Sequence, residues 1–222
     1  MVETDEEQLE VLKNWWDENG TTLVTTLVLG LAAIFGYRAW EDNVRETGEA
    51  ASSTYQNLVQ ATSNLDDENL RLTALSLGEE LKNDYEGSAY ASFAALHLAK
   101  IAVEQGDLAA AQAELQWTID QNPEAHLETI ARMRLARVLV DMEDAPAALA
   151  SLSEHEPAAG QQATWAEIRG DVYLALGDNV NARQAYQEAL ELLGDDRTRP
   201  LLELKLADIP LATEVTPTEE GA

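Results

Sequence analysis

The sequence predicts an all-α protein in which a single N-terminal transmembrane helix is followed by a solenoid of helical repeats. Three observations predict this fold class. Residues 19–37 form a stretch without any charged side chain. A turn motif then recurs three times at nearly equal spacing. Alanine and leucine, which both favour helices, are abundant, whereas only 2 phenylalanines occur in 222 residues.

Composition limits the classes of function that are open to this chain. Its 222 residues provide for one sizeable domain and an anchor. The absence of cysteine excludes disulfides, thiolate nucleophiles and Cys-ligated zinc. A net charge of −27 excludes binding to nucleic acid and means that any membrane attachment must be hydrophobic. The charge serves solubility or, alternatively, steers the chain toward a basic partner.

An acidic segment, residues 1–18, precedes the predicted transmembrane helix, residues 19–40. The charge-free part of that helix, Asn19–Tyr37, has 19 residues. As a helix it would be about 28 Å long, close to the roughly 30 Å hydrocarbon core of a bilayer. Aromatic side chains favour the membrane interface and occur at both ends: Trp15 and Trp16 before it, and Tyr37 and Trp40 after it.

Two alternatives to a membrane anchor are a cleaved signal peptide and a buried core helix. A signal peptide has a basic start, a shorter apolar core and small residues at its cleavage site. Here Lys13 is the only basic residue before the stretch, and AIFGYRAW offers no good cleavage site. The stretch is also long for a core helix. We therefore expect an uncleaved anchor.

The orientation of the anchor is not fixed by the sequence. Positive residues favour the cytoplasmic side of a membrane helix. Lys13 and the terminal amine lie before the stretch, and Arg38 and Arg45 lie after it. This near balance leans slightly toward a cytoplasmic C-terminal side.

A helical repeat pattern fills residues 41–212 and is clearest around the turn Gly177-Asp178. The flanking positions follow the tetratricopeptide pattern: Gly170 and Tyr173 before the turn, and Ala182, Tyr186 and Ala189 after it. Small residues are needed where two helices cross closely. Gly177 can end the first helix in a left-handed conformation at little cost. The pattern predicts a tetratricopeptide-like (TPR) solenoid.

Two further turns, Gly106-Asp107 and Glu143-Asp144, repeat this scheme. The three turns lie 37 and 34 residues apart, near the tetratricopeptide period of about 34. The flanking positions are again small or apolar and are followed by proline: Leu98, Ala99, Ala111, Leu115 and Pro123, then Leu135, Ala136, Ala148, Leu152 and Pro157. Glu143 in the glycine position departs from the pattern.

Both ends of the solenoid are predicted to be capped. A degenerate first repeat is expected before residue 91, with these contact positions: Tyr55, Leu58, Val59, Thr62, Leu72, Leu75, Leu81 and Tyr85. Arg199–Ile209 is expected to cover the last repeat, because terminal repeats need a capping face. Residues 213–222 are expected to form a disordered acidic tail.

No enzyme motif is present, so the sequence predicts a non-enzymatic protein without a cofactor or metal. It lacks the G-x-S-x-G, P-loop, G-x-G-x-x-G and H-E-x-x-H patterns. His97, His126 and His155 are spaced 29 residues apart. Metal ligands must converge on one site, whereas these histidines are expected on different helix faces.

The remaining candidate is a binding groove on the concave side of the solenoid, which the first helix of each repeat would line. The candidate residues are Leu96, Lys100, Glu104, Met133, Arg137, Asp141, Glu167, Asp171 and Leu174. They would form a mixed-charge groove for a polypeptide segment. The alternative is that they belong to ordinary solvated helix faces.

The sequence also resembles a known family. The resemblance is carried by VLKNWWDENG, GYRAW and ASSTYQNLV, and in the repeats by MRLARVLVDMEDAPAAL and IRGDVYLALGDNVNARQAYQEAL. These segments are similar to the YfgM family of bacterial inner-membrane proteins, the ancillary subunits of the SecYEG translocon. The similarity covers nearly the whole chain. Its most specific part runs from NWWDENG to GYRAW, which generic repeat proteins lack.

The resemblance implies a single-pass inner-membrane protein with a cytoplasmic N-terminus and a periplasmic repeat domain. It further implies association with the SecYEG translocon and with a periplasmic, membrane-anchored chaperone of the prolyl-isomerase type. The expected function is that of an adaptor that helps to hand exported polypeptides to periplasmic chaperones.

An alternative function is a regulatory scaffold that has no part in export. It would sequester a signalling or envelope-assembly protein through the acidic segment Glu3–Glu18. Deleting residues 1–14 would separate the two functions, because only the scaffold depends on that segment.

Overall fold

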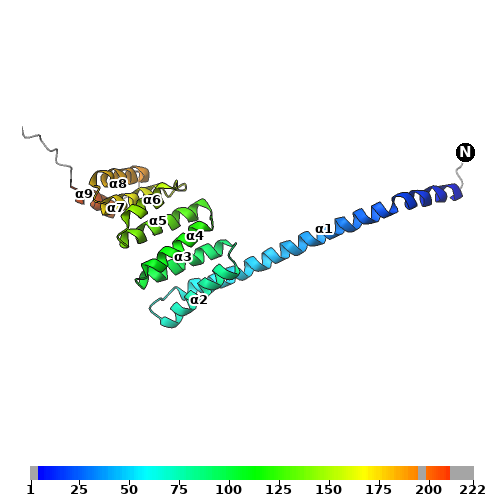
Figure 1. Cartoon of the computed structure of the whole chain (residues 1–222), viewed down its shortest axis with the longest axis horizontal. Helices are drawn as coiled ribbons and strands as arrows, with labels where there is room; N and C mark the ends of the chain where they lie inside the picture. The colour runs from blue at the N-terminus through cyan, green and yellow to red at the C-terminus, as the bar shows by residue number, and fades with distance from the viewer. Residues whose placement is uncertain (1–4, 195–198, 211–222) are drawn as a thin grey trace, which may run out of the picture. The chain divides into compact units, whose positions relative to one another are not determined.

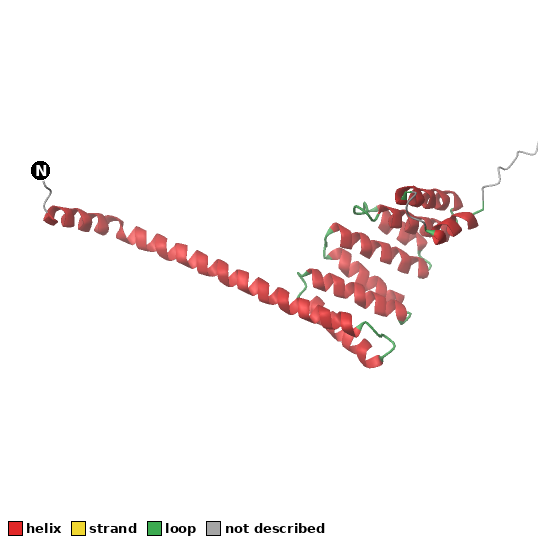
Figure 2. Ribbon diagram, turned by 180° about the vertical axis from the view of Figure 1, so that it is seen from behind, coloured by secondary structure: helices red, strands yellow, loops and turns green. Residues whose placement is uncertain are grey.

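The computed structural model describes residues 5–194 and 199–210, and all regular structure in these residues is helical (Figures 1 and 2). The chain divides into two compact units, Met1–Ala50 and Ala51–Ala222. The predicted acidic tail, residues 213–222, lies outside the described residues.

The N-terminal unit consists of most of α1, Asp5–Ala61, a helix of 57 residues. Among the described residues, α1 is the one helix that is long and apolar enough to cross a membrane. Its best 18-residue window has a mean hydropathy of 1.6, and 6% of that window is buried. The hydroxyls of Thr25 and Thr26 donate to the carbonyls of Thr21 and Thr22 at 2.7 and 2.8 Å. These polar side chains therefore need no external partner in an apolar environment.

The helix does not end at the predicted boundary of the membrane segment. It continues beyond Trp40 to Ala61, so that its last turns form the first element of the repeat unit. Leu58 and Ala61 in these turns are buried with Leu81 of the next helix in one apolar cluster.

Over the described residues, the repeat unit continues with eight helices that stack in chain order (Figure 1). They are α2 (Glu68–Asp84), α3 (Ala89–Glu104), α4 (Leu108–Asp120), α5 (Ala125–Asp141), α6 (Ala145–Ser153), α7 (Gln162–Ala175), α8 (Asn179–Leu193) and α9 (Pro200–Asp208). Consecutive helices from α2 to α9 pack against each other, and α5 also contacts α7. This pairwise packing is typical of a solenoid, in which each repeat contacts only its neighbours.

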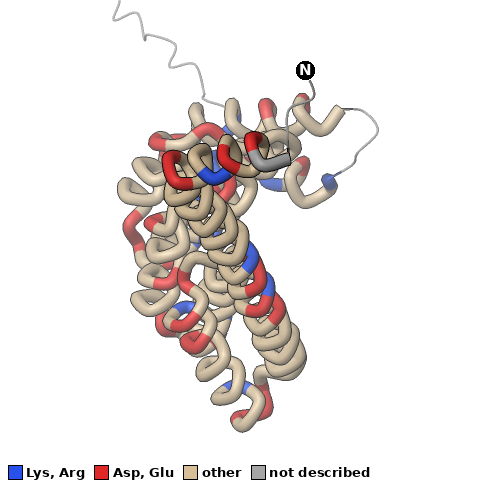
Figure 3. The backbone as a smooth tube through the Cα atoms, turned by 90° about the vertical axis from the view of Figure 1, so that its right-hand side faces the viewer, with Lys and Arg blue, Asp and Glu red and all other residues tan. Residues whose placement is uncertain are grey.

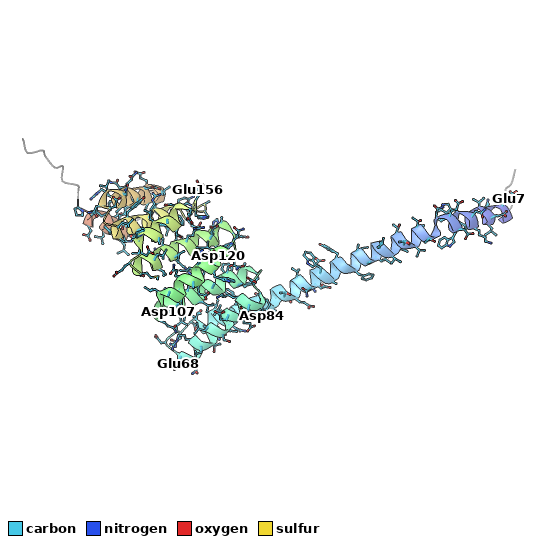
Figure 4. The ribbon with its side chains drawn as sticks, viewed as in Figure 1. Glu7, Glu68, Asp84, Asp107, Asp120 and Glu156 are labelled. Atoms are coloured by element: carbon cyan, nitrogen blue, oxygen red, sulfur yellow. The ribbon has the colours of Figure 1, made fainter. Side chains whose placement is uncertain are left out.

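The three predicted turns share one conformation. Gly106, Glu143 and Gly177 have φ values of 77°, 63° and 74°. The aspartate after each of them caps the next helix by accepting a backbone N–H bond, at 2.9 Å for Asp107. Figure 4 labels Asp107 at the turn between α3 and α4. The left-handed residue lets the backbone carbonyls at the end of one helix find hydrogen-bond donors, and the N-cap aspartate accepts from a free N–H at the start of the next helix.

Close helix crossings explain the small residues of the repeat pattern. A Cβ atom on Gly170 of α7 would lie 2.3 Å from the ring of Tyr186 on α8. Tyr186, Ala182 and Ala189 are all fully buried at this crossing. The small residues Gly170 and Ala182 therefore lie at a close helix crossing, as the tetratricopeptide pattern predicted.

The core is a row of three clusters rather than a single centre. The first joins the end of α1 to α2 and α3, the second extends from α3 to α7, and the third joins α7, α8 and α9. Leu202 of α9 is 0% exposed in the third cluster, which confirms the predicted C-terminal cap.

The degenerate first repeat also forms, but not all its predicted contact positions are buried. Val59 and Leu72 are 43% and 56% exposed, and Thr62 follows the end of α1. Apolar periodicity predicts which face of a helix is buried but not how many positions on either side of that face are covered. In this repeat the buried face is narrower than predicted.

Candidate partner-binding groove

Four of the predicted groove residues line one pocket of about 400 Å³ between α3 and α5. They are Lys100 and Glu104 from α3, and Arg137 and Asp141 from α5. Lys100 and Glu104 are one helical turn apart on α3, and Arg137 and Asp141 are one turn apart on α5, so each pair lies on one side of its helix. Leu115 of α4 also lines the pocket.

Leu96 and Met133 are not accessible groove residues, contrary to the prediction. They are 7% and 8% exposed and belong to the central apolar cluster. Both side chains pack into the cluster that extends from α3 to α7. A helical repeat pattern predicts which face of a helix is in contact but not how deeply each position on that face is buried.

The third section of the predicted groove is covered by the C-terminal helix. Lys205 of α9 lies 3.1 Å from Glu167 and 2.7 Å from Asp171 of α7, and Arg199 also pairs with Glu167. The hydroxyl of Tyr186 donates to Asp171 at 2.7 Å. These two carboxylates are therefore engaged within the chain. Leu174 remains 43% exposed.

Arg134 belongs to the pocket although the sequence analysis did not single it out. Its guanidinium donates to the carbonyl of Leu96 at 3.5 Å. Burial and the adjacent guanidinium of Arg137 lower the pKa of Arg134. A sequence feature that points to Arg134 is its position one helical turn before Arg137, since two neighbouring arginines are unusual in so acidic a chain.

The positive charges of Arg134 and Lys100 also act on His97, which lies on α3 about one helical turn before Lys100. Burial, then Arg134 and Lys100, lower the pKa of His97, so the imidazole is neutral at pH 7. Its Nε2 lies 3.5 Å from the hydroxyl of Tyr55. The ring of Tyr55 in turn contacts Phe93, with ring centroids 5.8 Å apart. His97 thus joins the cations of the pocket to a small aromatic cluster.

His155 contributes to the structure of the α6–α7 connection. It lies 3.0 Å from the hydroxyl of Thr129 and 3.3 Å from Glu128. The order of a hydroxyl, an imidazole and a carboxylate is also that of a catalytic triad. Here, however, Thr129 is 0% exposed, and its oxygen accepts a bond from the backbone of Ala158 at 3.1 Å. The cluster therefore anchors a loop, and its hydroxyl is buried.

Comparison with known proteins agrees with the repeat architecture. Residues 13–211 match the family described as a tetratricopeptide repeat-like domain. Three curated relatives each carry the name ancillary SecYEG translocon subunit. The Haemophilus influenzae protein is 29% identical over 205 residues, which is 92% of this chain and 97% of the relative. The Escherichia coli protein is 29% identical over 211 residues, or 95% and 99%.

The third relative, from Aggregatibacter actinomycetemcomitans, is 30% identical over 190 residues, which is 86% of this chain and 90% of the relative. No solved structure matches the chain.

Proposed function

We propose a function on the premise that this chain belongs to the tetratricopeptide repeat-like family that includes the ancillary SecYEG translocon subunits. In this proposal it is a non-enzymatic adaptor that α1 anchors in the inner membrane beside the SecYEG translocon. The observation that carries the proposal is the combination of an apolar, exposed helix and a repeat unit with a lined groove in one chain.

The anchor would act by raising local concentration. A protein held beside a channel meets the emerging polypeptide repeatedly, so a weak groove contact is sufficient for capture. The mixed-charge pocket between α3 and α5 suits such transient binding, because it combines charged side chains with an apolar floor.

We further propose the orientation and the periplasmic partners. The N-terminus would lie in the cytoplasm and the repeat unit in the periplasm. The groove would bind exported polypeptides or a membrane-anchored chaperone of the prolyl-isomerase type. The names of the relatives support the translocon, while the chaperone and the exported polypeptides are our inference from the family resemblance.

Site-specific photocrosslinking in membranes tests this function. A photoreactive residue at position 137, in the groove, is expected to capture a periplasmic chaperone or exported chains. One at position 33, in the apolar helix, is expected to capture a channel subunit. Ala113 on α4 is exposed and lies outside the groove lining, so position 113 is the matched control.

Capture of cytoplasmic proteins alone at position 137 would contradict both the orientation and the role in export. Equal capture at positions 137 and 113 would contradict the assignment of the groove. Deletion of residues 1–14 should leave periplasmic capture unchanged, because that capture needs only the anchor and the repeat unit.

A further inference from the structure

In the part of the chain that the structure describes, two arginines of the groove have no carboxylate partner, although the chain is strongly acidic. The sequence contains 41 Asp and Glu against 14 Lys and Arg. Acidic positions are spread over the repeat unit (Figure 3). Even so, within the described residues no carboxylate lies within 4.0 Å of the guanidinium of Arg134 or Arg137. Two such arginines in one pocket of so acidic a chain suggest that the partner comes from outside.

Six of the other eight cations in the described repeat unit have a carboxylate partner. Lys82 pairs with Glu114 at 2.8 Å, and Arg132 pairs with Glu128 at 2.9 Å. Lys100 pairs with Glu104, Arg169 with Glu188, Arg199 with Glu167, and Lys205 with Glu167 and Asp171. Arg71 and Arg183 donate to backbone carbonyls. Arg134 likewise donates to a backbone carbonyl, that of Leu96. What distinguishes Arg134 and Arg137 is that both line the same pocket without a carboxylate partner in the described residues.

The pocket around these arginines has an apolar floor. Ala99, Val103, Leu115 and Val138 line it together with the charged residues. The floor and the charges lie within one volume of about 400 Å³. This is large enough for one or two side chains of a bound peptide, because drug-sized ligands occupy roughly 300–1,000 Å³.

From this geometry we propose that the α3–α5 pocket recognises an acidic polypeptide segment, with a carboxylate bound by Arg134 and Arg137 and a neighbouring apolar side chain on the floor. The inference rests on the proposed function and names the chemistry of the segment that the groove takes. A guanidinium can bind a carboxylate through two parallel N–H bonds, which makes this pairing specific as well as strong.

The charge distribution favours a short acidic segment over a polyanion. Glu104 and Asp141 also line the pocket, and the net charge of the chain is −27. A nucleic acid or an anionic membrane would bring many negative charges near these acids and would be repelled. One or two carboxylates experience mainly the adjacent arginines, because more distant charges are screened beyond about 8–10 Å at physiological salt.

The two guanidiniums also repel each other where they are partly buried, and Arg137 is one cause of the lowered pKa of Arg134. A bound carboxylate would relieve this repulsion. The positions of the two guanidiniums in the free protein therefore already favour the binding of an anion.

Isothermal titration of the full-length protein in non-ionic detergent tests the proposal. The probe is a ten-residue peptide with two aspartates that flank a leucine, and the comparison is the same peptide with both aspartates replaced by asparagine. We expect the acidic peptide to bind at least about tenfold more tightly, the effect of one charge-assisted hydrogen bond. Its affinity should fall as salt is raised.

Variants of the pocket make the test specific. Arg134→Gln with Arg137→Gln should abolish the difference between the two peptides. Arg137→Lys should keep part of it, because a lysine retains the charge but not the paired N–H geometry. Arg45→Gln is the control for a lost charge, since Arg45 lies in α1 and is exposed. Circular dichroism would verify that each variant remains helical.

Equal binding of the two peptides, or no binding of either, would overturn the inference. So would an unchanged preference in the double variant. A failure of the acidic recognition can be told apart from a failure of the proposed function, because photocrosslinking tests the proposed function separately. If position 137 still captured periplasmic proteins while the peptides bound alike, the groove function would stand and the acidic recognition would fall.

Discussion

At the scale of single residues, the fold depends on a few close contacts. Gly170 is present because the ring of Tyr186 occupies the space that a Cβ atom would need. The hydroxyl of Tyr186 is not left unpaired in this core, since it donates to Asp171. One glycine therefore allows an aromatic side chain to fill the gap between two helices and to hold a carboxylate of the groove face.

Replacing Gly170 by alanine should destabilise the protein by about 1–3 kcal/mol, the usual cost of overpacking. The ring of Tyr186 would have to move within a packed core. Gly48 of α1 is the control, because a Cβ atom there would meet nothing within 4 Å. Gly48→Ala should be neutral or slightly stabilising. Urea unfolding of both variants checks this, and equal midpoints would refute the contact as the cause.

The lowered pKa of His97 predicts a dependence of stability on pH. The causes are burial, then Arg134 and Lys100. Because the folded state holds the proton less tightly than the unfolded state, His97 contributes stability above the unfolded pKa of about 6.5 that is lost as the pH falls through and below it.

The variant His97→Asn isolates this effect. Between pH 7.5 and 5.5 the melting temperature of the parent protein should fall more steeply than that of the variant. The carboxylates titrate in both proteins, so they do not contribute to the difference. Parallel curves would show that His97 has no such linkage.

At the scale of elements, the helix ends and the cap determine how the repeats are joined. Each predicted turn combines a residue at positive φ with a capping aspartate. The C-terminal helix then closes the row by burying Leu202 and by pairing Lys205 with α7. Because α9 covers the groove face of α7, the accessible part of the groove is the section between α3 and α5.

Glu143 occupies the left-handed position with a φ of 63°, where the other two turns have glycine. The variant Glu143→Gly should raise the unfolding free energy by about 0.5–1 kcal/mol, because a side chain in this conformation is strained by about 1–2 kcal/mol and the more flexible unfolded glycine offsets part of that gain. The reverse change, Gly106→Ala, should lower stability. Thermal unfolding of both variants is the measurement, and a loss of stability in Glu143→Gly would count against strain at this turn.

The capping role of α9 is tested by two neighbouring leucines. Leu202 is 0% exposed, whereas Leu201 is 74% exposed. Leu202→Ala should cost about 2–5 kcal/mol, as for other buried leucines. Leu201→Ala should change stability by no more than about 0.5 kcal/mol. Equal effects in denaturant unfolding would mean that α9 does not dock as described.

At the scale of the whole molecule, the sequence predicted the order of the parts better than the contents of the groove. Charge-free length predicted the membrane-compatible helix, and repeated turns predicted the solenoid, because both depend on local patterns. The burial of Leu96 and Met133 depends on how neighbouring helices approach. The pairing of Glu167 with Lys205 joins residues 38 apart in the chain, beyond the repeat period. Arg134 was missed because the pocket is defined by two helices together.

The proposal that α1 spans the membrane and separates the N-terminus from the repeat unit is open to a decisive measurement. The chain has no cysteine, so a single introduced thiol can be labelled without background. Gln8→Cys and Ala150→Cys both place it at exposed positions. Intact spheroplasts would be treated with a membrane-impermeant maleimide. We expect labelling at position 150 at once and at position 8 only after lysis. Labelling of both positions in intact spheroplasts, or of position 8 alone, would contradict a single span with a periplasmic repeat unit.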